Sequence, residues 1–395
     1  MARFAGGKAP FLRISDIKGH GTNVIMRDFM IGLLPVILFA WYKNGILVYS
    51  QGNINFIEML YPLFFIIVGG LGSILMEAIF FYVTDKDARK LKPLIDRLST
   101  SYAPIPGLIL ALMLPVYTPI WVLLFGCFIS NIIGKALFGG FGHNIFNPAL
   151  LGYAVIKVTL MGVINDAGAY FNVSEVLIDS YAGATPLSML AVNKIISFDA
   201  LVAPYGSLWD LFAGFHPGGL GETSFLIMII SYIWLSARKV IRWQTPLLFV
   251  TVFFGLSWIV GALNGVNGIW FPLYSIFTGG IMFGAVFMIT EPVTTPRNPL
   301  GKTIFVLFLA VLTILFRYVG NLPEGLGTSI ILMNIFALPI DKFSAIIKAN
   351  RWNKTTLKYV GILFGILLVL GFYAVLKAGS LYNLFIPLMS IGGGF

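Results

Sequence analysis

The sequence predicts an all-α polytopic membrane protein, with two inverted five-helix repeats that contain broken helices and one extra C-terminal transmembrane helix. Three observations support this class. Hydrophobic residues make up 58% of the 395 residues and charged residues only 11%, whereas a soluble domain carries about 25% charged residues. The apolar residues gather into separate segments of membrane-helix character. Short motifs recur in segments at a constant offset, which indicates an internal repeat.

Eleven hydrophobic segments are expected. They cover roughly residues 29–42, 59–83, 104–116, 118–134, 147–164, 223–237, 243–263, 273–290, 303–319, 325–340 and 357–378. Several are shorter than the ~20 residues that a full span needs. Broken helices are tolerated at membrane depth only where they line a protein or water-filled interior, so we expect a site inside the bundle.

The positive charges predict the orientation. With the N-terminus in the cytoplasm, 21 of the 26 Lys and Arg residues fall in or beside the cytoplasmic pieces, which is the positive-inside pattern. Those pieces are residues 1–28, 84–103, 135–146, 238–242, 291–302 and 341–356 with Lys358. The net charge of +10 is therefore attributed to topology, and no nucleic-acid partner is expected.

The same count divides the chain. We expect a cytoplasmic N-terminal segment (1–28), a first repeat (29–164), an outer-face loop (165–222), a second repeat (223–340), a cytoplasmic basic loop (341–356), and the extra helix with its tail (357–395). The outer-face loop carries six acidic residues against Lys194 alone. Thr185 in this loop is therefore expected at the outer face.

Two motif pairs indicate the repeat. "GLILALMLPVYTP" (107–119) in segment three matches "GAVFMITEPVTTP" (284–296) in segment eight, and "NIFNP" (144–148) matches "NIFALP" (334–339) in segment ten. Both pairs are five segments apart. A repeat with an odd number of spans must be inverted across the membrane, and inverted repeats place sites where their broken helices meet.

Two carboxylates and one arginine stand out within the apolar segments or at their ends. Glu77 is the deepest acid, and Glu291 precedes Pro292. Both are candidates for a cation path, because charged groups in membrane segments usually face an interior. Alternatively, Glu77 is a structural partner or a helix-end residue, and Glu291 an interfacial acid beside Arg297. For Arg317, snorkelling to the outer surface is slightly favoured over an interior position.

A Gly-rich stretch, "GGFGHNIFNPALLGY" (139–153), runs into segment five. Free N–H groups at a helix start can bind anions. Asn144 or Asn147 could equally cap the helix before Pro148, and the residues alone favour that interpretation. The chain has one cysteine and three histidines, and none shows metal-ligand spacing, so no metal site is expected.

"YAGATPLSML" (181–190) is the most unusual polar motif. Taken by itself it predicts a turn of small residues, with Thr185 as N-cap and Pro186 at the first helical position.

Several motifs together resemble the RnfD/NqrB family. "DSYAGATPL" (179–187) is similar to its flavin-attachment motif, "FGGFGHNIFNPALLGY" (138–153) to its Gly-rich Asn signature, and "MITEPVTTPRNPLGK" (288–302) to its acidic Pro-Val-Thr segment. "FRYVGNLPEGLGTSIILMNIFALPID" (316–341) resembles its final two spans, and the eleventh segment exceeds the family's usual ten.

The resemblance implies a flavin site. A dedicated flavin transferase would join FMN to Thr185 through a phosphoester, with Asp179, Gly183 and Ala184 as the surrounding motif residues. Asn144 and Asn147 become candidate cofactor-binding residues, and riboflavin is a possible second, noncovalent flavin.

The resemblance also implies a role in a complex. The chain would be the membrane subunit of an Rnf-type complex that passes electrons between ferredoxin and NAD+ and moves Na+ or H+, with a flavoprotein subunit among its partners at the outer face. Two alternatives remain open. One is an NqrB-like subunit of a Na+-translocating NADH:quinone reductase, and the other is a non-redox inverted-repeat transporter.

Overall fold

The computed structural model describes residues 21–167, 185–193, 196–320, 322, 325–350 and 354–383 of the chain. All regular structure within these ranges is helical. Seven of the described helices are long and apolar enough to cross a membrane, and a bent pair adds an eighth. The predicted all-α polytopic class is therefore confirmed, whereas the inverted relation between the two halves stays a prediction.

The helices fall into two groups along the chain. The first group comprises α1 (Thr22–Trp41), α2 (Leu47–Ser50), α3 (Phe56–Thr84), α4 (Leu91–Ser101), α5 (Pro104–Met113), α6 (Ile120–Phe128), α7 (Pro148–Thr159) and α8 (Met161–Asp166). The second comprises α9 (Pro186–Asn193), α10 (Phe198–Leu201), α11 (Leu208–Ala213), α12 (Phe225–Ala237), α13 (Gln244–Leu263), α14 (Trp270–Phe277), α15 (Ile281–Phe283), α16 (Pro299–Ile314), α17 (Leu326–Asn350) and α18 (Lys354–Asn383). Single π-helical turns continue α1 (Tyr42–Ile46), α6 (Ile129–Ile133), α15 (Gly284–Met288) and α16 (Leu315–Val319).

Each of the eleven predicted segments overlaps one long helix, one short apolar helix or the bent pair. Proline and glycine explain the short ones. α5 ends at Met113 because Leu114 is extended before Pro115, as a residue preceding proline prefers. α14 and α15 meet at 64° across Gly279, whose φ of +68° suits glycine best. The predicted broken helices are therefore confirmed.

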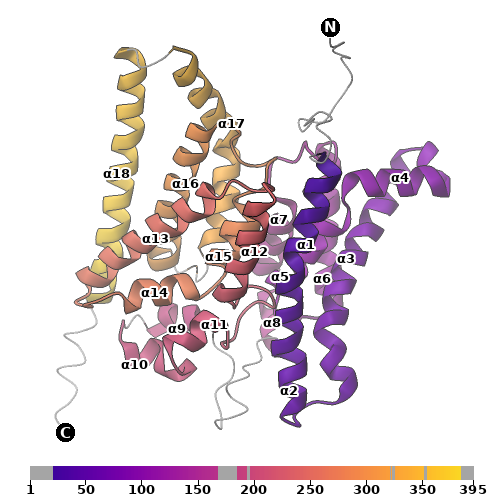
Figure 1. The fold of residues 1–395 in the computed structure, drawn as a ribbon, viewed down its shortest axis with the longest axis horizontal. Helices are drawn as coiled ribbons and strands as arrows, with labels where there is room; N and C mark the ends of the chain where they lie inside the picture. Colours follow the sequence, from indigo (N-terminus) through magenta and orange to yellow (C-terminus); the bar gives the residue numbers. More distant parts are fainter. Residues whose placement is uncertain are drawn as a thin grey trace.

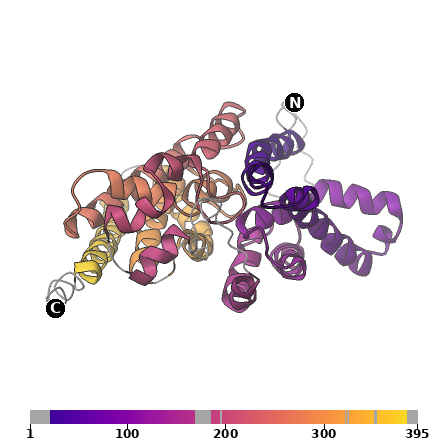
Figure 2. The same ribbon diagram turned by 90° about the horizontal axis from the view of Figure 1, so that it is seen from below.

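The two groups of helices stand side by side (Figure 2). They touch where α12 packs against α1 and where α7 packs against α17. Figure 1 shows α4 and the start of α18 at one end of the bundle, here called the basic end, and α9, α10 and α11 at the opposite end, here called the threonine end. The described helices of the 165–222 stretch thus lie at the end opposite α4, and which end faces the cytoplasm stays a prediction.

Three of the expected segments contain helical structure, while the domain boundaries themselves stay predictions. The loop expected at 341–356 is largely helical, because α17 continues to Asn350 and α18 begins at Lys354. Residues 341–350 contain no Gly or Pro, so the helix can run on beyond its apolar part. Likewise α1 begins at Thr22 within the expected N-terminal segment, and the 165–222 loop contains the short helices α9, α10 and α11.

Candidate functional site

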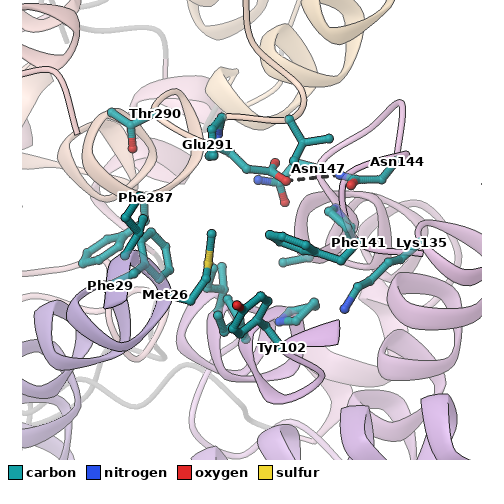
Figure 3. Close-up of a pocket in the computed structure, with 18 of the residues that line it drawn as sticks. Met26, Phe29, Tyr102, Lys135, Phe141, Asn144, Asn147, Phe287, Thr290 and Glu291 are labelled. Atoms are coloured by element: carbon teal, nitrogen blue, oxygen red, sulfur yellow. Dashed lines mark hydrogen bonds between the residues drawn. The ribbon is translucent and has the colours of Figure 1, made fainter. Parts of the chain in front are cut away.

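A cavity with an empty volume of about 740 Å³ lies between the two groups of helices, towards the basic end. Its walls come from α1, the start of α5, the Gly-rich loop before α7, the α12–α13 turn and the residues after α15. Figure 3 shows its labelled side chains facing a common space. Its polar lining residues are Tyr102, Lys135, Asn144, Asn147, Thr290 and Glu291. An apolar cavity with a few convergent polar groups is the usual form of a small-molecule site.

Aromatic rings flank this cavity in two pairs. Phe29 and Phe287 meet edge to face with ring centroids 5.5 Å apart, and Tyr102 and Phe141 do so at 4.9 Å. Phe29 comes from the first group of helices and Phe287 from the second, so the cavity depends on both. Edge-to-face pairs hold their rings in a defined orientation.

The two asparagines of the Gly-rich stretch have different roles. Asn147 is the N-cap of α7, because its Oδ1 accepts a hydrogen bond from the backbone N–H of Leu150 at 3.1 Å. The capping prediction is confirmed for this residue. Asn144 is not the cap; its Nδ2 donates to Oε1 of Glu291 at 3.1 Å (Figure 3). One asparagine therefore starts the helix and the other contacts the acid across the cavity.

Asn334 links the recurring motifs in space. Its Oδ1 accepts a hydrogen bond from the backbone N–H of Asn147 at 3.1 Å, and its Nδ2 donates to the carbonyl oxygen of Thr294 at 3.0 Å. Members of both recurring motif pairs, from segments five, eight and ten, thus meet at one point in the structure. Buried amide groups of this kind are costly to leave without partners.

Glu291 lies between these groups. Its Oε2 accepts a hydrogen bond from Oγ1 of Thr294 at 2.8 Å, in addition to the contact with Asn144. Burial raises the pKa of Glu291 to about 7, although these hydrogen bonds and the positive charge of Lys135 oppose the shift. The carboxyl group can therefore gain or lose a proton near neutral pH.

Glu77 is an ion-pair partner within the bundle. Its side chain is 1% exposed, and Oε1 lies 2.6 Å from Nζ of Lys135, which is 3% exposed. Oε2 accepts a hydrogen bond from Oγ of Ser101, whose carbonyl oxygen also accepts from Lys135 at 2.6 Å. This geometry supplies the partner that the structural alternative for Glu77 requires; a place on a cation path stays a prediction.

Sequence reasoning misses Lys135, because the charge count places it in a cytoplasmic loop. The structure instead buries it at the end of the helical stretch Ile120–Phe138. Lys135 lines the large cavity and also a second hollow of about 550 Å³ that contains Glu77, Asp85 and Arg97. The Lys135 side chain thus borders both spaces.

Thr185 lies at the threonine end, directly before α9. Its Oγ1 accepts a hydrogen bond from the backbone N–H of Ser188 at 3.2 Å, and Pro186 takes the first helical position. The N-cap prediction is confirmed. Thr185 also lines a hollow with an empty volume of about 320 Å³, together with Leu187, His216, Pro217, Gly218, Gly219, Glu222, Thr223 and Gly279. Asp179, Gly183 and Ala184 lie outside the described residues.

A strap formed by residues 214–224 makes the floor of this hollow. Nζ of Lys43 donates to the carbonyl oxygen of His216 at 2.5 Å and to Oγ1 of Thr223 at 3.1 Å. The pKa of His216 is lowered to about 4, mainly by burial and then by the charge of Lys43, so this side chain is neutral at pH 7. A buried lysine from α1's continuation therefore fixes the strap beside Thr185.

The start of α9 is held from the other side. The hydroxyl of Tyr274 on α14 donates to the carbonyl oxygen of Pro186 at 2.6 Å. Arg317 stands close by: it is 3% exposed and donates from Nη1 to the carbonyl oxygen of Ser275 at 2.7 Å. Snorkelling is therefore the wrong prediction for Arg317, because a backbone acceptor inside the bundle takes up its guanidinium group.

Comparison with known proteins shows to which family this chain is similar. The sequence profile described as "NQR2, RnfD, RnfE family" matches residues 9–348. The D subunit of the proton-translocating ferredoxin:NAD(+) oxidoreductase complex of Clostridium ljungdahlii is 31% identical over 347 residues, which cover 87% of this chain and 96% of that protein.

Two other relatives show the breadth of the similarity. The D subunit of the ion-translocating oxidoreductase complex of Actinobacillus succinogenes is 34% identical over 289 residues, covering 64% of this chain and 78% of that protein. The B subunit of the Na(+)-translocating NADH-quinone reductase of Chromohalobacter salexigens is 33% identical over 262 residues, covering 65% of this chain and 61% of that protein.

Proposed function

The chain belongs to the NQR2, RnfD, RnfE family, and we propose that it is the membrane subunit of an Rnf-type ferredoxin:NAD+ oxidoreductase. In this proposal the chain carries FMN covalently on Thr185 and couples electron transfer to the movement of Na+ or H+. It acts with the other membrane and peripheral subunits of the complex, including a flavoprotein subunit at the outer face. The isolated chain is expected to be inactive.

The extent of the similarity favours an Rnf-type subunit over an NqrB-like one. The aligned region covers 96% of the Clostridium ljungdahlii relative but only 61% of the Chromohalobacter salexigens relative. Both relatives are named as subunits of redox complexes, which argues against a transporter without a redox role. The NqrB-like subunit therefore stays the nearer alternative.

The position of Thr185 carries the flavin proposal. Its hydroxyl stands at the start of a helix that is held by Tyr274, and it lines a hollow whose wall includes Gly218, Gly219 and Gly279. Thr185 is only partly buried and borders this hollow, so the residues present fit a phosphoester-linked flavin at its hydroxyl. A bound flavin supplies a carrier for one or two electrons. A flavin transferase acting from the outer face is the implied source of the bond.

The large cavity is our proposed place for the second, noncovalent flavin, riboflavin. The flanking rings of Phe29, Phe141 and Phe287 match a flat apolar ring system, while Asn144 offers an amide that can turn towards a ligand. Asn147 would act mainly by positioning, because its Oδ1 already caps α7. The cavity's mixture of apolar walls and few polar groups supports this assignment.

Glu77 and Glu291 are the residues we propose for the ion path. Both are buried carboxyl groups. Lys135 interacts with both of them, because it forms an ion pair with Glu77 and its charge also acts on Glu291. A lysine between two acids can compensate whichever one is ionised when a cation is absent. The choice between Na+ and H+ does not follow from this arrangement.

Covalent flavin on Thr185 is tested by denaturing gel electrophoresis. We expect the chain, produced together with its flavin transferase, to keep flavin fluorescence after denaturation, and mass spectrometry to find FMN on the peptide that contains Thr185. Thr185→Ala should lose the fluorescence, whereas Ser188→Ala, which alters the neighbouring hydroxyl, should keep it. A colourless wild-type chain, or fluorescence retained in Thr185→Ala, contradicts the proposal.

A further inference from the structure

Two buried cations stand close to the hollow beside Thr185. Arg317 and Lys43 are 3% and 2% exposed, and they lie in the π-helical turns that continue α16 and α1. The one carboxylate among the described residues that line the hollow is Glu222, which is 8% exposed. Charges inside a membrane bundle are costly and usually serve a purpose there. Two cations near a single acid suit a space that receives an anion.

Arg317 reaches the wall of the hollow at a glycine. Gly279 lines the hollow, and Nη2 of Arg317 lies 3.2 Å from the point where a Cβ on Gly279 would stand. Cδ1 of Leu187, another lining residue, lies 2.4 Å from the same point. Two lining residues therefore come close to the guanidinium group, and the one at position 279 has no side chain to keep an anion away from it.

The guanidinium group is fixed by residues outside the hollow's lining. Its Nη1 donates to the carbonyl oxygen of Ser275 at 2.7 Å, and its Cζ lies 5.2 Å from the centroid of the Phe253 ring. Because the group is planar, these two contacts set its orientation, with Nη2 on the side of Gly279. Arginine is not deprotonated in proteins, so Arg317 supplies a permanent positive charge at this place.

Lys43 stands behind the strap of residues 214–224. Its ammonium group donates to Oγ1 of Thr223 and to the carbonyl oxygen of His216, and both of these residues line the hollow. The charge of Lys43 is felt on the strap, because it helps to lower the pKa of the His216 side chain. A positive charge that disfavours a second cation at this wall favours an anion beside it.

We propose that the hollow is a phosphate subsite, in which Arg317 compensates the negative charge of the phosphodiester that would join FMN to Thr185. This inference rests on the proposed covalent flavin and names the residues that receive its phosphate. Lys43 adds a second positive charge, so that the two cations together outweigh Glu222. Arginine suits this task because its fork of N–H groups matches phosphate oxygens.

The charge preference of the hollow can be tested without any flavin, in the full chain made without the transferase. Thr185→Asp and Thr185→Asn both place a good capping side chain before α9 and differ in charge. We expect Thr185→Asp to unfold in detergent at a temperature a few degrees above that of Thr185→Asn. Ser197, the N-cap of α10, provides the control, because the same two substitutions there measure the effect of a helix start alone.

The control pair at Ser197 should give a clearly smaller difference than the pair at Thr185. Differences of the same size at both positions, or a less stable Thr185→Asp, would overturn the inference. This comparison leaves Arg317 in place, so it decides the matter even where a variant of Arg317 does not fold.

A second set of variants assigns the effect to Arg317. In the background of Arg317→Met the difference between Thr185→Asp and Thr185→Asn should shrink, and in Arg317→Lys, which keeps the charge, most of it should return. Arg242→Met removes an exposed arginine between α12 and α13 and should leave the difference unchanged. A full difference in Arg317→Met would show that Arg317 does not serve the hollow.

Flavin attachment gives a further readout and separates this inference from the proposed function. With the transferase present, Arg317→Met should slow the transfer of FMN to Thr185 roughly tenfold or more, as expected for the loss of a hydrogen bond to a charged group. In the chain that is still modified, the phosphorus NMR signal should move towards that of the denatured protein. Arg317→Lys should keep most of the rate.

The two possible failures are distinguishable. A wild-type chain without flavin on Thr185 contradicts the proposed function itself. A wild-type chain with flavin, together with an unchanged transfer rate and an unchanged phosphorus signal in Arg317→Met, contradicts the phosphate subsite alone.

Discussion

Lys135 and Glu77 form a buried ion pair, with 2.6 Å between Nζ and Oε1 and side chains that are 3% and 1% exposed. Taking two charges out of water costs several kcal/mol, which their attraction and added hydrogen bonds must offset. Ser101 supplies one hydrogen bond to each partner. The intact pair is therefore expected to add little net stability. Removing one partner is expected to destabilise the protein strongly, because the other charge is left buried and unpaired.

We expect Glu77→Gln to destabilise the protein by about 3–5 kcal/mol, because Lys135 is left charged and buried. The double variant Glu77→Gln with Lys135→Met should recover most of this loss. Thermal unfolding in detergent measures both. Asp85→Asn removes an exposed pair with Arg97 and serves as the control, with at most about 1 kcal/mol lost. A double variant no more stable than Glu77→Gln would exclude the buried pair as the cause.

The same double variant also tests the ion path. Because it replaces Lys135 as well, the measurement is not affected by a buried lysine that has lost its partner. In the reconstituted complex, Glu77→Gln with Lys135→Met should slow cation uptake while the covalent flavin remains attached to the chain. Uptake and in-gel fluorescence are measured on the same preparation. Pumping at the wild-type rate in this variant would remove Glu77 from the ion path, whatever its role in stability.

Glu291 should make stability depend on pH near neutrality. Burial raises its pKa from 4.5 to about 7, so the folded protein holds this proton more tightly than the unfolded chain does. The resulting stabilisation is complete below about pH 4.5 and is lost as the pH rises through 7, by about 3 kcal/mol in all. Unfolding temperatures at pH 5 and pH 8 should therefore differ more in the wild type than in Glu291→Gln. Equal differences would show that Glu291 does not titrate in this range.

The sequence predicts the helices well because their signals are local. Apolar runs locate the spans, and the breaks that the structure shows fall at Pro115 and Gly279, residue types that commonly interrupt helices. The asparagine cap at Asn147 and the threonine cap at Thr185 follow from the next residue being proline. These features need no knowledge of the rest of the fold.

Buried cations could not be predicted in this way. Lys43, Lys135 and Arg317 are each at most 3% exposed, and each is held by groups distant in the sequence, such as His216 at 173 residues from Lys43. A lysine at the edge of an apolar run has the same local pattern whether it faces lipid headgroups or an interior acid. Only the three-dimensional partner decides, which is why the sequence alone places Lys135 in a loop.

Asn334 should prove important for joining the two groups of helices. Asn334→Ala removes the acceptor for Asn147 and the donor to Thr294, and each unsatisfied buried group costs about 1–3 kcal/mol. We expect a lower unfolding temperature and less noncovalent flavin after purification. Asn264→Ala removes a buried amide that bonds within its own helix, so flavin content should be unchanged. Equal effects of both variants on flavin would argue against a bridge at Asn334.

Gly279→Ala should alter the hollow beside Thr185 without contacting Thr185 itself. Gly279 has a φ of +68°, and an added Cβ would lie 2.4 Å from Cδ1 of Leu187, two residues after Thr185. The backbone conformation alone costs a non-glycine residue about 1–2 kcal/mol, and the side chain of Leu187, which lines the hollow beside Thr185, has to shift to make room. We therefore expect a clear loss of covalent flavin fluorescence when the variant is produced with the transferase. Gly255→Ala, where nothing lies within 4 Å of the added Cβ, is the matched control and should flavinylate normally. Normal flavin attachment in Gly279→Ala would mean that the hollow beside Thr185 does not govern the modification.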